Sequence, residues 1–180
     1  MERFDPIEQK PKQILHVGQG EFAVADDPSV VLSTLLGSCV STCLFDPISK
    51  VGGLNHIILP NDLSTDPFDL MVQVNAMECL INALLKQGAM RSRLVAKVFG
   101  GANMIGSLAS VGEKNTEFVF SFLNDESISV EGQDVGGTKA RNIRFEPTTG
   151  RVRLKVVIDQ PLEVTKRTCK KLQGSELELF

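Results

Sequence analysis

The chain of 180 residues is 42% apolar and 23% charged, a composition typical of a globular protein large enough to bury a core. Its net charge of −3 and its lack of Trp and Tyr argue against a nucleic-acid partner, because such binding usually needs a basic surplus and aromatic side chains for stacking. No apolar run approaches the ~20 residues of a membrane-spanning helix, and the charged N-terminus has no apolar signal-peptide centre. We therefore expect a cytoplasmic protein without membrane insertion.

Three regions are predicted along the chain. Residues 1–12 are polar and contain two prolines, so they are predicted to form a flexible N-terminal arm. Residues 13–159 are predicted to form a single domain. Residues 160–180 carry basic, acidic and apolar groups in patches and are predicted to form a charged C-terminal tail.

The first part of the domain predicts strands in succession. Residues 13–24 alternate enough for a strand that is broken near Gly18 and Gly20. Residues 29–60 are rich in Val, Thr, Leu and Ile, and they predict strand, break, strand, turn and strand. The break at Gly37 indicates a sharp bend or a close backbone approach.

The period of the apolar residues then changes. Residues 66–88 predict a helix with Asp66 as N-cap and Gly88 as terminator. The mixture of strands with two helices favours an α+β domain over a doubly wound parallel sheet. The helix is predicted to bury Leu70, Val74, Met77, Ile81 and Leu84, and the elements after it are a strand (93–99), a helix (113–125), a strand (127–131), a turn or ligand-facing loop (134–137) and a hairpin (141–146 with 151–158).

Cys39 and His56 are the candidates for nucleophilic chemistry. A free thiol has a pKa near ~8.5 and needs a base, for which histidine is the usual partner. One strand, a turn and a returning strand separate the two residues, so they can lie side by side. At a bend, the backbone N–H of Cys39 could help form an oxyanion hole. Taken alone, Cys39 is better explained as a small buried hydrophobe, and His56 as a structural or exposed histidine.

Two other chemistries fit the sequence less well. Cys39, Cys43 and His56 have only loosely ligand-like spacing and no second tight pair, so no metal is predicted. Gly100-Gly101 matches neither glycine pattern that binds phosphates. We interpret the glycines as a place where another backbone, such as a substrate strand, approaches closely, with an ordinary turn as the alternative.

Five segments in a fixed order carry a family resemblance over roughly residues 15–157. They are Thr34–Val40 with Asp46-Pro47, Gly52–His56 with Leu59-Pro60, Lys97–Asn103, Asp134–Gly137 with Arg141, and Thr149–Val152. In this order the segments resemble the chemoreceptor glutamine deamidase family, CheD.

The resemblance implies a fold, a reaction and a set of catalytic residues. The fold would be α+β, a single layered domain of two packed mixed β-sheets with flanking helices, similar to that of deamidating toxins with a cysteine nucleophile. The reaction would hydrolyse selected glutamine side chains on methyl-accepting chemotaxis receptors to glutamate, with release of ammonia. Cys39 and His56 would act with an upstream hydroxyl, for which Thr34 is the first candidate and Ser33 the alternative, and no cofactor is implied.

The resemblance also implies substrate contacts and partners. The cytoplasmic domains of the receptors would be the substrate, and a CheC-type phosphatase would be a second partner. A regulatory module that binds such a phosphatase or receptors without catalysis stays open as an alternative, as does a general thiol enzyme such as a transglutaminase or peptidase. The predicted substrate contacts are Ser38, Asn55, Gly100, Gly101 and Asn103.

Overall fold

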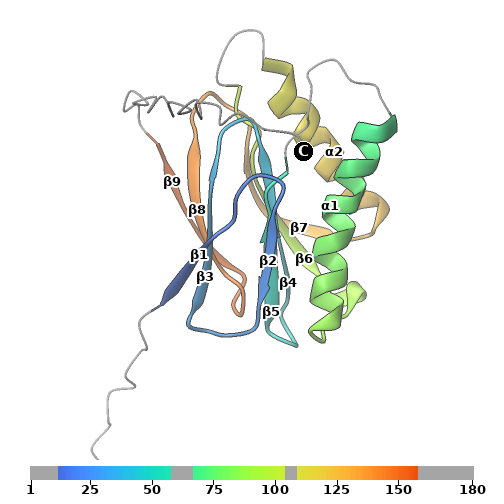
Figure 1. The fold of residues 1–180 in the computed structure, drawn as a ribbon, viewed down its shortest axis with the longest axis vertical. Coiled ribbons are helices and arrows are strands. Elements are labelled where there is room, and N and C mark those ends of the chain that lie inside the picture. The colour runs from blue at the N-terminus through green and yellow to red at the C-terminus, as the bar shows by residue number, and fades with distance from the viewer. Residues whose placement is uncertain (1–11, 58–66, 104–108, 158–180) are drawn as a thin grey trace, which may run out of the picture.

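Two β-sheets packed face to face, with two helices over one of them, make up the domain (Figure 1). The computed structural model describes residues 12–57, 67–103 and 109–157. Each sheet contains one parallel pair, β1 with β3 and β6 with β7, so both sheets are mixed. The predicted α+β class and its two packed mixed sheets with flanking helices are confirmed.

The four-stranded sheet has the order β1-β3-β8-β9 and the five-stranded sheet the order β2-β5-β4-β6-β7. Helices α1 and α2 lie on the outer face of the five-stranded sheet, and neither of them covers the outer face of the four-stranded sheet (Figure 1). The elements are β1 (Gln13–His16), β2 (Phe22–Ala25), β3 (Val30–Leu36), β4 (Val40–Asp46), β5 (Val51–Asn55), α1 (Pro67–Lys86), a short 3-10 helix (Arg91–Arg93), β6 (Val95–Gly100), α2 (Ala109–Asp125), β7 (Ser129–Val135), β8 (Arg141–Glu146) and β9 (Arg151–Val156).

Two predictions about strands need correction. The strand predicted over 13–24 is two strands in different sheets, since Gly20 at φ 76° turns the chain from β1 into β2. The turn predicted over 134–137 begins only at Gly136, because Asp134 and Val135 continue β7 in parallel register with the end of β6. The hairpin predicted near the C-terminal end of the domain is confirmed as β8 and β9.

Among its described side chains, helix α1 buries the predicted face except at Val74. Met77, Ile81 and Leu84 are fully buried as predicted, but Val74 is 37% exposed. Gln73 is buried in its place, one helical turn before Met77. The side chain of Leu70 lies outside the described residues, and so do the predicted N-terminal arm up to residue 11 and the tail from residue 160.

Strand β4 is buried on both faces and separates two hydrophobic cores. Val40 and Leu44 pack in the core beneath the helices, whereas Cys39 just before the strand, Cys43 and Phe45 pack in the core between the sheets. This follows from the two-residue period of a strand, which sends alternate side chains to opposite faces. The parity of a residue near β4 therefore decides whether it faces the helices or the second sheet.

None of the helices that the structure describes is long and apolar enough to span a bilayer.

A buried carboxylate fastens the far end of β4. The Asp46 side chain accepts hydrogen bonds from the backbone N–H groups of Ile48, Ser49 and Met90, and from the Arg93 guanidinium at 2.6 and 2.9 Å. Burial alone would raise the pKa of Asp46, but these donors outweigh it and hold the pKa well below its usual range. One carboxylate thus joins the β4–β5 turn to the chain that leads into β6.

Replacing this carboxylate tests its structural role. We expect Asp46→Asn to lower the free energy of unfolding in urea by about 3 kcal/mol, because the Arg93 ion pair and the charge-assisted hydrogen bonds are lost. The difference in free energy of unfolding between the two proteins should shrink as the pH falls below about 4. In that range the carboxyl becomes protonated in the unfolded state, and this lowers the stability of the unmutated protein. The exposed Asp26→Asn is the control and should change stability by less than about 0.5 kcal/mol. Equal effects of the two substitutions would contradict the assignment.

Candidate active site

The loop that presents Cys39 is held by all three of its carbonyl groups. It joins β3 to β4 through Gly37, Ser38 and Cys39. The Gly37 carbonyl accepts from the Ala102 N–H at 2.8 Å, the Cys39 carbonyl from the Gly101 N–H at 2.8 Å, and the Ser38 carbonyl from Asn115 Nδ2 at 3.0 Å. The end of β6 and helix α2 therefore fix the backbone on both sides of the cysteine.

Glycine is required where β6 meets this loop. Gly100 and Gly101 have φ angles of 110° and 65°, and a Cβ at Gly100 would collide with the Cys39 carbonyl oxygen. A Cβ at Gly101 would collide with the Thr116 hydroxyl of α2. The close approach predicted for these glycines is real, but the backbone that approaches belongs to Cys39 itself rather than to a substrate strand.

Strand pairing places Cys39 and His56 on the same face of the five-stranded sheet. Val40 and Ile57 form an antiparallel bridge with N–H···O distances of 3.0 and 2.8 Å, in register with the Cys43–Leu54 pair of β4 and β5. In this register His56 lies one step diagonally from Cys39, and both side chains project toward the four-stranded sheet. The structure thus brings the two predicted residues to one site in the core between the sheets.

Thr34 reaches His56 from the opposite sheet. Its hydroxyl donates to the Val17 carbonyl at 2.7 Å and lies 2.8 Å from His56 Nδ1. Because the single hydroxyl proton is used on Val17, the oxygen faces the ring as an acceptor, and Nδ1 must carry the imidazole proton. This fixes the tautomer that leaves Nε2 unprotonated. Within the described ranges, Nε2 is buried and has no hydrogen-bond partner.

Ser33 points the other way. Its hydroxyl donates to the Ile143 carbonyl of β8 at 3.0 Å, on the opposite face of β3 from Thr34. Of the two hydroxyl residues proposed from the sequence, the structure therefore brings only Thr34 against the histidine.

Burial keeps both reactive groups neutral in the free protein. Cys39 is 4% exposed and His56 is 5% exposed. Burial raises the pKa of the Cys39 thiol, although a hydrogen bond from Gln19 partly opposes the shift. Burial also lowers the pKa of His56, against a smaller opposite effect of Val17 and Glu21. The resting site thus contains a thiol and a neutral imidazole whose free nitrogen can accept a proton.

The predicted substrate contacts fall into two groups. Ser38 is part of the Cys39 loop, and Asn103 directly follows Ala102, which bonds to that loop. Asn103 Oδ1 is buried with no partner among the described residues. Asn55 lies on the other face of the sheet, where its side chain accepts from the Thr42 N–H at 2.9 Å and contacts Met77 of α1. Asn55 therefore supports the strands behind the site and does not face the sulfur.

Two residues that the sequence did not single out contact the Cys39 loop. Gln19 donates from Nε2 to Cys39 Sγ at 3.4 Å, and Asn115 donates to the Ser38 carbonyl. Gln73 of α1 in turn donates to Asn115 at 3.4 Å. A glutamine between two glycines and an asparagine within a helix are compatible with solvent exposure, so no local pattern identifies them.

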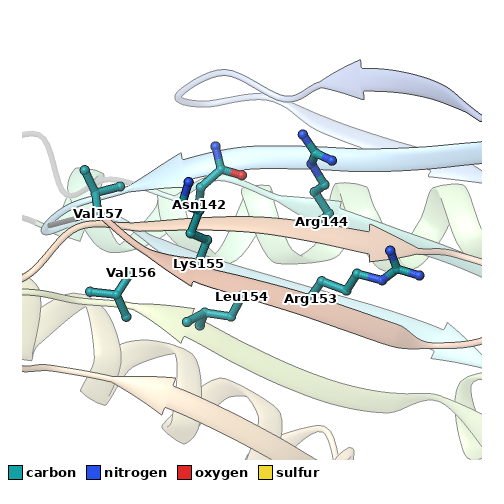
Figure 2. Close-up of a pocket in the computed structure, with 7 residues that line it drawn as sticks. All are labelled: Asn142, Arg144, Arg153, Leu154, Lys155, Val156 and Val157. Atoms are coloured by element: carbon teal, nitrogen blue, oxygen red, sulfur yellow. The ribbon is translucent and has the colours of Figure 1, made fainter.

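Metal-binding clusters and cavities both bear on the location of the site. In residues 12–57, 67–103 and 109–157, no three His, Cys, Asp or Glu side chains gather as a metal site would require. A small cavity of about 170 Å³ lies beside His56 and α1. A larger one of about 760 Å³ lies away from Cys39, on the outer face of β8 and β9 (Figure 2), and is lined by Asn142, Arg144, Arg153, Leu154, Lys155, Val156 and Val157.

Comparison with known proteins gives these features a context. The family model described as CheD chemotactic sensory transduction matches residues 63–156. A protein of Cereibacter sphaeroides named "Probable chemoreceptor glutamine deamidase CheD" is 51% identical over 140 residues, which is 78% of this chain and 70% of the relative. A Sinorhizobium medicae protein of the same name is 49% identical over 142 residues, which is 77% of this chain and 78% of that protein.

Solved structures show weaker similarity. A Neisseria meningitidis protein assigned to the family model DUF152 superposes with a TM-score of 0.44 at 10% identity, covering 71% of this chain. A Bacillus licheniformis hypothetical protein, YfiH, gives a TM-score of 0.41 at 12% identity. This chain spans 64% and 61% of these two structures.

The fold and the site define a class of α+β proteins that present a cysteine and a tautomer-fixed histidine between two packed sheets. Sequence identity near 50% over more than three quarters of the chain then makes the assignment specific. The chain belongs to the CheD family.

The contact between Thr34 and His56 can be tested without an activity assay. We expect Thr34→Val to lower the free energy of unfolding by about 2 kcal/mol, because the buried Nδ1–H loses its acceptor. The nitrogen chemical shifts of the imidazole should then show a mixture of tautomers. Thr34→Ser keeps the hydroxyl and should keep the single tautomer, while the exposed His16 serves as an internal reference in each spectrum. A single unchanged tautomer in Thr34→Val would contradict the proposed hydrogen-bond directions.

The reactivity of Cys39 should follow its burial. Since burial raises the thiol pKa, we expect the rate of Cys39 alkylation by iodoacetamide to rise with pH through a midpoint above the ordinary value near ~8.5. Peptide-level mass spectrometry separates this thiol from the other cysteines. The same thiol in urea-unfolded protein is the reference and should return to the ordinary midpoint. A folded-state midpoint below the unfolded one would show that the free protein already holds a thiolate.

Proposed function

We propose that this protein hydrolyses the side-chain amides of selected glutamines on methyl-accepting chemotaxis receptors, with Cys39 as nucleophile. The observation that carries the proposal is the placement of Cys39 and His56 on one face of the sheet, with Thr34 2.8 Å from His56 Nδ1 and with Nε2 buried and unpaired among the described residues. The curated relatives of about 50% identity carry the name of this activity. The receptors' cytoplasmic domains would be the substrate, so the protein would act in the cytoplasm.

The first chemical step is attack of sulfur on the glutamine carboxamide. His56 Nε2 takes the thiol proton while Cys39 Sγ forms a bond to the amide carbon, giving a tetrahedral intermediate with a negatively charged oxygen. The imidazolium returns its proton to the amide nitrogen, the carbon–nitrogen bond breaks, and ammonia leaves. The product of this step is a thioester between Cys39 and the former glutamine side chain.

Water completes the reaction. His56 Nε2 accepts a proton from water as its oxygen attacks the thioester carbon, and the carbon–sulfur bond then breaks. The thiolate recovers a proton and a glutamate carboxyl group is released. The net reaction consumes one amide and one water and yields one carboxylic acid and one ammonia, so no cofactor is needed.

The Cys39 loop supports the charged intermediate. With the carbonyls of Gly37, Ser38 and Cys39 all held by hydrogen bonds to other parts of the chain, this backbone is fixed before substrate binds. No carbonyl acceptor for the Cys39 N–H is found in the part of the chain that the structure describes. We assign this N–H to the oxyanion, since a fixed donor costs no reorganisation when the charge forms.

Thr34 acts as the third member of the site. A triad residue that holds the imidazole orients the ring and stabilises the imidazolium that forms during proton transfer. A hydroxyl that accepts from Nδ1 and is itself held by the Val17 carbonyl fulfils the orienting part of this role. A CheC-type phosphatase stays a predicted second partner, with no contact surface assigned to it.

Incubation with a receptor cytoplasmic fragment tests the proposal. We expect specific glutamines to convert to glutamate in peptide-level mass spectrometry, and Cys39→Ala to lower the rate by at least about 10³-fold. The half-buried Cys79→Ala is the matched control and should keep full activity, because Cys79 lies on α1 apart from the Cys39 loop.

Three other outcomes would contradict the proposal. Conversion that persists in folded Cys39→Ala would assign the chemistry to another group. The absence of conversion by the unmutated protein on receptors from its own organism, together with retained receptor binding, would favour the regulatory module. Amine incorporation or backbone cleavage would favour a general thiol enzyme.

A further inference from the structure

We propose that Gln19 is a further catalytic residue, whose carboxamide N–H stabilises first the Cys39 thiolate and then the oxyanion of the tetrahedral intermediate. The inference rests on the proposed function for its second part only. It is carried by the contact of Gln19 Nε2 with Cys39 Sγ at 3.4 Å, which makes Gln19 a neighbour of the reacting atom.

The segment around Gln19 is fixed by the same groups that build the site. The Gly20 N–H donates to the His56 carbonyl at 2.9 Å, and the His56 N–H donates to the Glu21 carbonyl at 3.0 Å. On the other side of Gln19, the Val17 carbonyl accepts the Thr34 hydroxyl. The backbone on each side of Gln19 is thus bonded to a member of the site, so the position of Gln19 is set together with that of His56 and Thr34.

The exposure of the two partners indicates where Gln19 stands. Gln19 is exposed, whereas the sulfur it contacts belongs to a residue that is only 4% exposed. The Gln19 side chain therefore connects an exposed residue to the buried sulfur. A substrate amide that reaches Cys39 past this side chain would meet its carboxamide.

A carboxamide N–H can donate a hydrogen bond to both negatively charged groups that form in the reaction, the thiolate and the oxyanion. A neutral thiol is a weak acceptor, but a thiolate is a strong one, so the donor gains strength as His56 removes the proton. After attack the negative charge moves from sulfur to the oxygen bonded to the same carbon, one atom away. The donor from Gln19 would then complement the Cys39 N–H, giving the oxyanion two donors from different loops.

This donor also offsets part of the effect of burial. Burial raises the Cys39 pKa, and the hydrogen bond from Gln19 acts in the opposite direction. The bonds that hold the neighbouring backbone would remain without the Gln19 side chain, so its removal should leave the fold intact. Its loss should therefore affect the reactivity of Cys39 and not the stability of the protein.

The experiment compares Gln19→Met, which keeps length but removes the donor, with Gln19→Glu, which places a carboxylate beside the sulfur. The exposed Gln87→Met at the end of α1 is the matched control. One measurement is the pH midpoint of Cys39 alkylation by iodoacetamide, followed on the Cys39 peptide by mass spectrometry. The other is kcat and KM on a receptor cytoplasmic fragment, with thermal unfolding recorded for every variant.

We expect Gln19→Met to raise the alkylation midpoint by about one pH unit and to lower kcat by about 10²-fold, with a smaller change in KM. Gln19→Glu should raise the midpoint further, because a negative charge opposes the thiolate. Gln87→Met should change neither quantity, and unfolding temperatures should stay close to that of the unmutated protein.

Each alternative outcome has a distinct meaning. An unchanged alkylation midpoint together with an unchanged kcat in Gln19→Met would overturn the whole inference. A shifted midpoint with an unchanged kcat would overturn the oxyanion role of Gln19. Conversion of Gln19 to glutamate in the unmutated protein but not in Cys39→Ala would overturn it as well, by showing that Gln19 occupies the substrate's place. A shifted midpoint with no receptor turnover by the unmutated protein would support the thiolate contact and contradict the proposed function.

Discussion

A single hydroxyl group between the two sheets determines the chemistry that the site can perform. Thr34 donates to a backbone carbonyl and therefore can only accept from His56, so one hydrogen-bond direction fixes the next. The result is an imidazole with a defined free nitrogen that is buried and unpaired among the described residues. The same contact joins Thr34 of β3 in one sheet to His56, the residue after β5 in the other sheet. The orientation of the imidazole therefore depends on how the two sheets pack.

The second constraint is the two-sided burial of β4. Its alternate residues must satisfy the core under the helices and the core between the sheets, and this leaves little freedom in its register. Cys39 stands at the start of this strand with the parity that faces the second sheet, and the pairing with β5 gives His56 the same parity. The proposed nucleophile and the proposed base are therefore aligned by the requirements of the core, while Gly100 and Gly101 allow close approach of the Cys39 loop.

Much of this arrangement could be predicted from the sequence, because it depends on local patterns. The Gly-Ser-Cys break between two apolar runs identified the cysteine loop, and the order of five segments identified the family. The sequence favoured Thr34 over Ser33 only through the family resemblance, since adjacent strand residues face opposite sides and a one-residue difference in register exchanges them. Gln19 gave no signal, because its contact with Cys39 joins two loops whose proximity depends on the sheets being assembled. The orientation of Asn55 toward α1 depends on the same parity, which the sequence does not give.

The order of these groups along the chain has a consequence for biosynthesis. Val17, Gln19, Thr34, Cys39 and His56 all precede α1, so they leave the ribosome in the first third of the chain. The strand β8 that flanks β3, the strand β6 that flanks β4 and the helix that holds the Ser38 carbonyl all follow later. A nascent chain that has just released His56 contains every reacting group but lacks the neighbours that align them. These five residues therefore reach their final arrangement only after the C-terminal hairpin has joined β3 in the smaller sheet.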